Sequence, residues 1–144
     1  MLFYQALHGT SYALCRIMDA QTILIVDDEP RFRFSLALTL AHHGYHVLEG
    51  SDGAEALRVL SEHSESVPHI NLVVTDIKMP GMDGLELVKR IRQSNVPVKV
   101  LVMTGFGDRE TVSRLQGMGV CGVIHKPFDG EQLVGAIRSV LEKC

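Results

Sequence analysis

Continuous apolar runs alternate with amphipathic segments five times along the chain. The runs are short and rich in β-branched residues, which is typical of strands buried on both faces of a parallel sheet. They occupy residues 22–26, 45–48, 70–75, 98–102 and 121–124. Each run is followed by a segment whose apolar residues recur every three or four positions, as they do on one face of a helix. The pattern predicts five strand–helix units.

Local signals indicate where the helices begin and which face of each is buried. Pro30 suits a first helical position, and Gly44 is a natural stop after that helix. Ser51 or Asp52 can cap the second helix, and Asp129 the last. The residues predicted to face inward are Phe32, Leu36 and Leu40, then Ala54, Leu57 and Leu60, then Leu87, Val88 and Ile91, then Val112 and Leu115, and finally Leu133, Ile137 and Val140.

Strand–helix alternation has a direct consequence for the fold class. Parallel strands need crossover connections, and such crossovers are right-handed, so that helices cover both faces of the sheet. We therefore predict an α/β fold with three layers. The domain is expected to span residues 21–144, preceded by an N-terminal extension over residues 1–20 that is either a tail or an extra helix. We expect no output domain within these residues.

Composition narrows the class of protein. The chain has 144 residues, 46% hydrophobic and 22% charged, which suits one globular domain. The net charge of −3 argues against direct nucleic-acid binding, which needs a basic face. No apolar run approaches the roughly 20 residues of a membrane span. Three cysteines without metal-type spacing are expected to be reduced thiols, so we predict a cytoplasmic protein without membrane contact.

Four of the five predicted strands end in groups that could serve one reaction. The first delivers Asp27 and Asp28, the third Asp76, the fourth Thr104 and the fifth Lys126. The second ends in residues 49–50, to which we assign no role. In open α/β sheets, ligands bind beyond the carboxyl ends of the strands. We therefore expect these five side chains to share a site.

The chemistry of these groups points to metal-assisted phosphoryl transfer. Crowded carboxylates repel one another, and a hard cation such as Mg2+, which prefers oxygen ligands, relieves that repulsion. Asp27, Asp28 and Asp76 could hold one such ion. A carboxylate beside the ion can attack phosphorus and form an aspartyl phosphate. Thr104 and Lys126 are the available groups to bind the phosphoryl oxygens.

Four motifs together resemble the response-regulator receiver domain of two-component signalling. They are Val26-Asp27-Asp28-Glu29, Asp76-Ile-Lys-Met-Pro-Gly-Met-Asp-Gly84, Met103-Thr104-Gly105 and Lys126-Pro127-Phe128. The resemblance covers about residues 21–143. It implies a flavodoxin-like doubly wound (βα)5 sandwich with a parallel sheet in the order 2-1-3-4-5.

The resemblance also implies a role for each matching residue. Asp76 would be the phosphoacceptor, and the backbone carbonyl of Lys78 would join Asp27, Asp28 and Asp76 in holding Mg2+, with Mn2+ as a substitute. Thr104 would bond a phosphoryl oxygen, and Lys126 would pair with the phosphoryl charge. The peptide bond between Lys126 and Pro127 would be cis.

Partners follow from the same resemblance. The phosphoryl donor would be a phosphohistidine on a sensor histidine kinase or a histidine phosphotransfer protein. Phosphorylation would switch the surface around the fourth helix, fifth strand and fifth helix, which would then bind a downstream effector protein or output domain, or form a homodimer. The chain would not be an enzyme for a separate substrate, since it would catalyse only its own phosphorylation and dephosphorylation.

One position departs from the usual pattern of the family, and one nearby aromatic residue bears on the same question. Receivers commonly place Tyr or Phe three residues before the lysine, where this chain has Val123. The usual aromatic contribution to switching is therefore in question. Phe106, two residues after Thr104, is the aromatic residue expected to shield Asp76 from water.

Three other functions fit parts of the pattern. Haloacid dehalogenase-like phosphatases usually carry a second acidic residue two positions after the nucleophile, but this chain has Lys78 there. A flavodoxin-like flavin carrier would need a first loop that binds phosphate, which Asp27 and Asp28 would repel. A receiver that kept the fold and lost the switch remains an alternative, although every catalytic position is filled.

Overall fold

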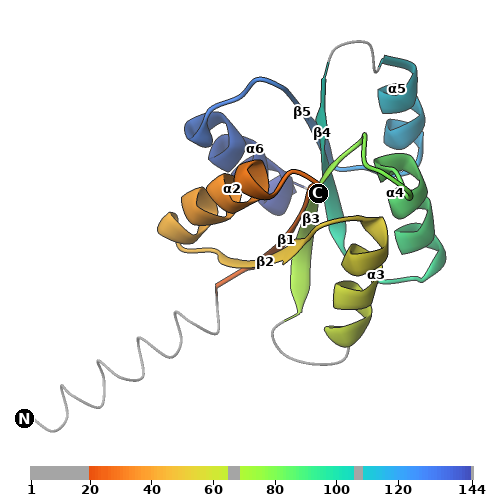
Figure 1. Cartoon of the computed structure of the whole chain (residues 1–144), viewed down its shortest axis with the longest axis horizontal. Helices are drawn as coiled ribbons and strands as arrows, with labels where there is room; N and C mark the ends of the chain where they lie inside the picture. Colours follow the sequence, from red (N-terminus) through yellow and green to blue (C-terminus); the bar gives the residue numbers. More distant parts are fainter. Residues whose placement is uncertain (1–19, 65–68, 106–108, 144) are drawn as a thin grey trace, which may run out of the picture.

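The computed structural model describes residues 20–64, 69–105 and 109–143, and it contains the five strand–helix units (Figure 1). The strands are β1 (Thr22–Val26), β2 (His46–Gly50), β3 (Ile70–Asp76), β4 (Lys99–Thr104) and β5 (Gly122–His125). The helices are α2 (Pro30–His42), α3 (Gly53–Glu62), α4 (Gly84–Gln93), α5 (Arg109–Gly117) and α6 (Gly130–Lys143). The predicted helix start at Pro30 is confirmed.

All five strands are parallel and form one sheet in the order β2-β1-β3-β4-β5. This order confirms the doubly wound fold expected from the sequence. β1 and β3 are adjacent in the sheet, with Val26 opposite Thr75 near their carboxyl ends. The order of the strands reverses direction at β1 and β3, so the edge beyond these two strands is where this fold class binds ligands.

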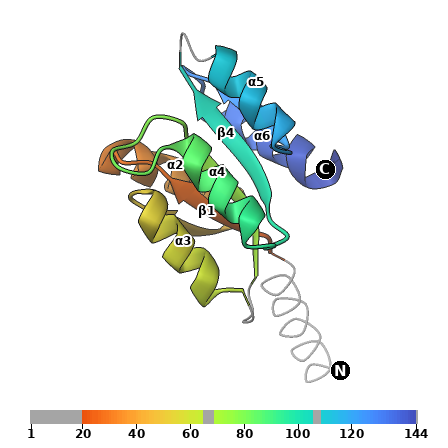
Figure 2. The same ribbon diagram turned by 90° about the vertical axis from the view of Figure 1, so that its right-hand side faces the viewer.

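Two apolar cores lie on opposite faces of the sheet. Helices α2 and α6 cover one face, and α3, α4 and α5 cover the other (Figures 1 and 2). Alternate residues of β1 supply both cores: Leu24 and Val26 pack toward α3 and α4, and Ile23 and Ile25 toward α2 and α6. β1 is therefore buried on both sides, as its uninterrupted apolar sequence predicts.

Three helices begin with an aspartate that caps the exposed backbone N–H groups. Asp52 accepts a hydrogen bond from the Glu55 N–H at 2.8 Å, and Asp83 accepts one from Glu86 at 2.9 Å. Asp129 and Gln132 exchange two such bonds, both of 2.8 Å. These bonds satisfy donors that a helix cannot satisfy internally. The predicted caps at Asp52 and Asp129 are confirmed.

Some predicted bounds and faces differ from the structure. Strand β2 runs to Gly50 because its backbone pairs with β1 as far as Val26. Helix α3 is rotated from the predicted face: Ala54 is exposed, whereas Ala56 and Val59 are buried. The buried face turns this way because α3 packs against both β2 and α4, a contact that periodicity alone does not specify.

Arg92 joins segments at the far end of α4. Its guanidinium donates hydrogen bonds to three backbone carbonyls: Val98 at 3.0 Å, Met118 at 3.3 Å and Gly119 at 2.9 Å. Gly119 has a φ of 81°, which L side chains rarely adopt. One side chain thus fastens the end of α5 to the start of β4.

Two further findings bear on the expected environment of the protein. Within the described ranges, no helix combines the length and the apolar character that a membrane span requires. Cys121, the cysteine that lies within the described residues, is disulfide-bonded. The expectation of reduced thiols is therefore wrong at this position, because sequence spacing does not reveal which cysteines approach one another in space.

Candidate functional site

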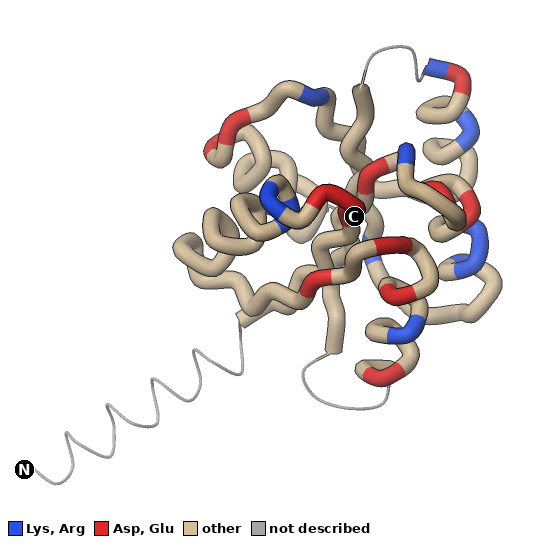
Figure 3. Tube along the Cα trace, viewed as in Figure 1, with Lys and Arg blue, Asp and Glu red and all other residues tan. Residues whose placement is uncertain are grey.

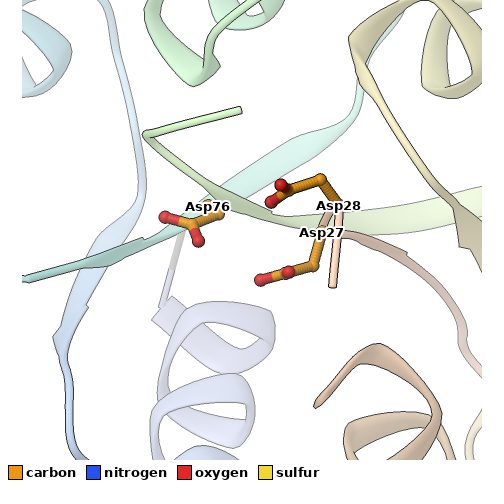
Figure 4. Close-up of side chains that lie close together, drawn as sticks. All are labelled: Asp27, Asp28 and Asp76. Carbon is orange, nitrogen blue, oxygen red and sulfur yellow. The ribbon is translucent and has the colours of Figure 1, made fainter. Parts of the chain in front are cut away.

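Three carboxylates meet at the carboxyl edge of the sheet. Asp27 and Asp28 directly follow β1, and Asp76 ends the neighbouring β3 (Figure 4). One oxygen from each carboxylate lies within 4.8 Å of the other two. Acidic positions gather around this region at the centre of the tube view, with basic positions beside them at the start of α2 and others along α4 and α5 (Figure 3). The structure thus brings together the three predicted metal ligands.

Asp27 is the most buried of the three, with 2% of its side chain exposed. Its Oδ1 accepts a hydrogen bond from the Glu29 N–H at 2.9 Å, whereas its Oδ2 accepts none from any described residue. Burial raises the pKa of Asp27 above its ordinary value of 3.8. The Glu29 bond and Lys126 oppose that rise, while the charges of Asp76 and Asp28 add to it.

Lys126 approaches the carboxylates from the end of β5. Its Nζ donates to Asp76 Oδ2 at 2.7 Å and lies 3.8 Å from Asp27 Oδ2, an ion-pair distance too long for a hydrogen bond. The Lys126 N–H donates to the carbonyl of Thr104 at 2.7 Å, which continues the pairing of β5 with β4. The predicted cis bond between Lys126 and Pro127 is confirmed.

Thr104 and Lys78 lie on the two segments beside this cluster. Thr104 is buried at the end of β4, and its hydroxyl donates to the Gly105 carbonyl at 3.0 Å. The Lys78 N–H donates to Asp76 Oδ1 at 3.3 Å, and the Lys78 side chain is exposed. This hydrogen bond holds the backbone of Lys78 beside the Asp76 carboxylate. The predicted role of the Lys78 carbonyl remains a prediction.

Gly84 allows α4 to begin against the backbone of Asp76. A Cβ at this position would lie 2.5 Å from the Asp76 carbonyl oxygen and 2.8 Å from the Cα of Ile77. The Gly84 N–H also donates to the Ile77 carbonyl at 2.7 Å. Real Cβ atoms do not approach backbone so closely, so the position requires glycine. The turn that ends in Gly84 thereby fixes the backbone of Asp76.

The carboxylate cluster fits a small divalent cation. Asp27 Oδ2 is a buried oxygen without a hydrogen bond to any described residue, it lies beside two other carboxylates, and Lys126 offsets part of their charge. Mg2+ binds oxygen ligands at about 2.0–2.1 Å, so two ligands on opposite sides of one ion lie about 4.2 Å apart. The observed spacing of up to 4.8 Å is close to that span. Asp27, Asp28 and Asp76 would hold the ion.

Two residues near the site carried no site role in the sequence prediction. Arg33 donates to the Asp27 carbonyl at 2.7 Å and pairs with Glu49 at 3.1 Å, so Glu49 contributes to the support of the site. The ring of Phe32 lies beside Lys126. The signal that could have found both is their place in the first helical turn after Asp27 and Asp28. Phe106, the expected shield, lies outside the described residues.

A family comparison agrees with this geometry. The family model of the response regulator receiver domain matches residues 23–138. The chain belongs to this family. Receiver domains are generally Mg2+-dependent, which agrees with the acidic cluster.

Curated relatives include other receiver proteins of different overall size. Sporulation initiation phosphotransferase F of Bacillus subtilis is 30% identical over 121 residues, which cover 84% of this chain and 94% of that protein. The transcriptional regulatory protein FixJ of Bradyrhizobium diazoefficiens is 32% identical over 122 residues, 85% of this chain and 57% of FixJ. This receiver also matches 13% of the sensor kinase CckA of Brucella abortus. It therefore spans only part of several relatives.

Solved structures show the same fold. A response regulator receiver domain protein from Clostridium thermocellum has a TM-score of 0.78 and 28% identity, with 85% of this chain and 95% of that chain covered. The N-terminal part of FixJ has a TM-score of 0.76 and 29% identity, with 88% and 98% covered. The flavodoxin-like receiver fold predicted from the motifs is confirmed.

Proposed function

We propose that this receiver domain accepts a phosphoryl group on Asp76 from a phosphohistidine and signals through the resulting change in its surface. The observation that carries the proposal is the 2.7 Å contact between Lys126 Nζ and Asp76 Oδ2 beside the acidic cluster. The contact supports the proposal because phosphoryl transfer to a carboxylate requires a cation beside the acceptor oxygens.

The side chains of the site have complementary roles in this reaction. Asp76 supplies the nucleophilic oxygen, and the Oδ–P bond that forms is that of an acyl phosphate, a mixed anhydride, while the P–N bond to the donor histidine breaks. The histidine nitrogen leaves with the bonding electron pair. Mg2+, when bound, would neutralise phosphoryl oxygens and the carboxylates of Asp27 and Asp28. Lys126 would then pair with a phosphoryl oxygen, since the acyl phosphate carries about −1.5 to −2 charges in place of the single charge of the carboxylate.

Thr104 connects the reaction to the rest of the molecule. In the structure its hydroxyl donates to the Gly105 carbonyl, a bond it can exchange for one to a phosphoryl oxygen. Such an exchange would draw the end of β4 toward Asp76. Helix α5 and strand β5 would follow, because packed elements change between discrete arrangements. The surface formed by α5, β5 and α6 would then bind an effector protein, an output domain or a second copy of the chain.

The remaining expectations belong to the same proposal. The donor would be a sensor histidine kinase or a histidine phosphotransfer protein, and the protein would act in the cytoplasm. The chain would turn over only its own phosphoryl group. Its relatives support a kinase partner, because their printed names include a phosphotransferase, a sensor kinase and transcriptional regulators.

Labelling with acetyl phosphate and Mg2+ tests the proposal, with intact-protein mass spectrometry as the measurement. Wild-type protein is expected to gain one phosphoryl group, and Asp76→Asn none, because an amide cannot serve as the nucleophile. Lys126→Ala is expected to keep some labelling. In NMR spectra, it is expected to lose the chemical-shift changes of α5 and β5 that accompany phosphorylation of the wild type. A wild-type protein that gains no phosphoryl group, or an Asp76→Asn variant that gains one, would contradict the proposal.

A further inference from the structure

The ammonium group of Lys126 contacts an aromatic ring as well as carboxylates. Its Nζ lies 4.7 Å from the centroid of the Phe32 ring. A cation within about 6 Å of a ring centroid is attracted by the negative face of the π-system. The ammonium group therefore has three neighbours: Asp76 at 2.7 Å, Asp27 at 3.8 Å and the ring of Phe32.

The place of Phe32 in the fold explains this contact. Helix α2 begins at Pro30, directly after the aspartates that end β1, and its first turn lies at the carboxyl edge of the sheet. The Glu29 carboxylate caps this turn by accepting hydrogen bonds from the N–H groups of Arg31 and Phe32. The backbone of Phe32 is thus fixed by the cap, and its ring points toward the end of β5.

A second aromatic residue supports the ring. Phe32 and Phe128 pack in a tilted arrangement with centroids 6.0 Å apart. Together with Gly105, Lys126 and Pro127 they line a mainly apolar pocket of about 360 Å³ at the surface. Phe32 is only half-buried, whereas Leu36 and Leu40, the next residues of its stripe, are buried. The ring therefore packs against the core on one side and reaches the edge of the site on the other.

We propose that Phe32 is a positioning residue for Lys126, holding its ammonium group where phosphoryl oxygens arrive; this inference rests on the proposed function. A lysine ammonium on a flexible four-carbon stem loses considerable rotamer freedom when it is fixed. The side chain of Lys126 is 31% exposed, so solvent competes for the ammonium group. A ring in contact with the ammonium group restricts that competition.

The ring contact also differs from the carboxylate contact during the reaction. When Asp76 is phosphorylated, its Oδ2 no longer offers Lys126 the same full negative charge, and Lys126 must bond a phosphoryl oxygen instead. The ring of Phe32 does not take part in that exchange. Phe32 therefore holds the ammonium group at the site while its bond moves from Asp76 to a phosphoryl oxygen, the stage at which the carboxylate no longer fixes it.

A fluorination series at position 32 tests this role without changing the fold. Phe32 is replaced by 4-fluoro-, 3,5-difluoro- and 3,4,5-trifluorophenylalanine, which keep nearly the same shape but weaken the negative face of the ring. Labelling by acetyl phosphate at saturating Mg2+ is then timed by mass spectrometry. The rate is expected to fall stepwise with fluorine content, to about fivefold below wild type for the trifluoro ring, the factor of an ordinary cation–π contact.

Replacements of Phe32 by standard amino acids provide a second test of the same role. Phe32→Leu keeps an apolar side chain but removes the π-system, and is expected to slow labelling about fivefold, whereas Phe32→Tyr keeps the ring and should stay within about twofold of wild type. The matched control is the same fluorination series at Phe34, which lies on the same helix with 58% of its side chain exposed and should leave the rate unchanged.

The outcomes separate this inference from the proposed function. If wild-type protein is labelled and its rate does not change along the Phe32 series, the positioning role is wrong while the phosphoacceptor role stands. If wild-type protein is not labelled at all, the proposed function itself fails. Because acetyl phosphate needs no docking partner, a loss of rate cannot be assigned to weaker binding of a kinase.

Discussion

The aspartates at the helix starts and those at the strand ends are the same residue type in opposite surroundings. Asp52 and Asp83 each accept a backbone N–H at 2.8–2.9 Å, so their charge is used to stabilise a helix. Asp27 is buried beside Asp28 and Asp76, and its pKa is raised by burial and by their charges. The difference teaches that a carboxylate at a helix start stabilises the folded state, whereas the crowded carboxylates at the strand ends destabilise it when no cation is bound.

The largest effect that would test this comparison is the loss of metal binding in Asp27→Asn. An amide offers a neutral oxygen in place of a charged one, and affinity for hard cations depends on the charge of the ligands. We expect the affinity for Mg2+ to fall more than about tenfold, measured by titration followed by NMR. The control is Asp52→Asn, which should leave the affinity unchanged. Equal losses in the two variants would contradict the distinction between the two sets of aspartates.

The same substitution should stabilise the fold when no metal is present. The pKa of Asp27 in the folded state lies above its ordinary value of 3.8, so the folded state binds this proton more tightly than the unfolded state does. The stability of the wild type therefore falls as pH rises from 3.8 through the raised pKa of the folded state. Asp27→Asn should therefore gain about 1 kcal/mol of stability at neutral pH, or about 4 °C in Tm, and should gain nothing below pH 3.8. Thermal unfolding at several pH values in a chelator measures this difference, and a gain that is the same at every pH would argue against the charge of Asp27 as its cause.

The smallest effect concerns the caps. Asp52→Ala removes the acceptor of the Glu55 N–H and should cost about 1 kcal/mol in the free energy of unfolding, measured with denaturant. Asp52→Asn should restore most of it, because an asparagine oxygen caps equally well. Neither variant should change the rate of labelling. A cap variant that slows phosphorylation would show that the start of α3 belongs to the site.

Much of the fold and of the site could be predicted because the signals are local. The uninterrupted apolar run from Thr22 to Val26 identifies a central strand, and the residues that follow a strand must lie at its carboxyl edge. Asp27, Asp76 and Lys126 could therefore be brought together before any coordinates were known. The structure places these side chains close together, and it adds the 2.7 Å contact of Lys126 with Asp76, which the sequence did not specify.

What could not be predicted depends on contacts between distant segments. The apolar stripe through Phe32 indicates a buried helical face, but it does not reveal that the first residue of the stripe also meets Lys126. The sequence likewise gives no sign that Arg33, a residue in the first turn of a helix, donates a hydrogen bond to the Asp27 carbonyl. The prediction that Ala54 faces inward was wrong, because the rotation of α3 about its axis depends on the elements that it packs against.

The guanidinium of Arg92 has a consequence for how movement can spread. Its three bonds to the carbonyls of Val98, Met118 and Gly119 fasten the carboxyl end of α5. A helix that is held at one end cannot easily shift along its axis, so a displacement of its other end changes its tilt. Helix α5 follows the carboxyl end of β4 in the chain, so under the proposed function a shift at its amino end would tilt the helix about the end that Arg92 holds.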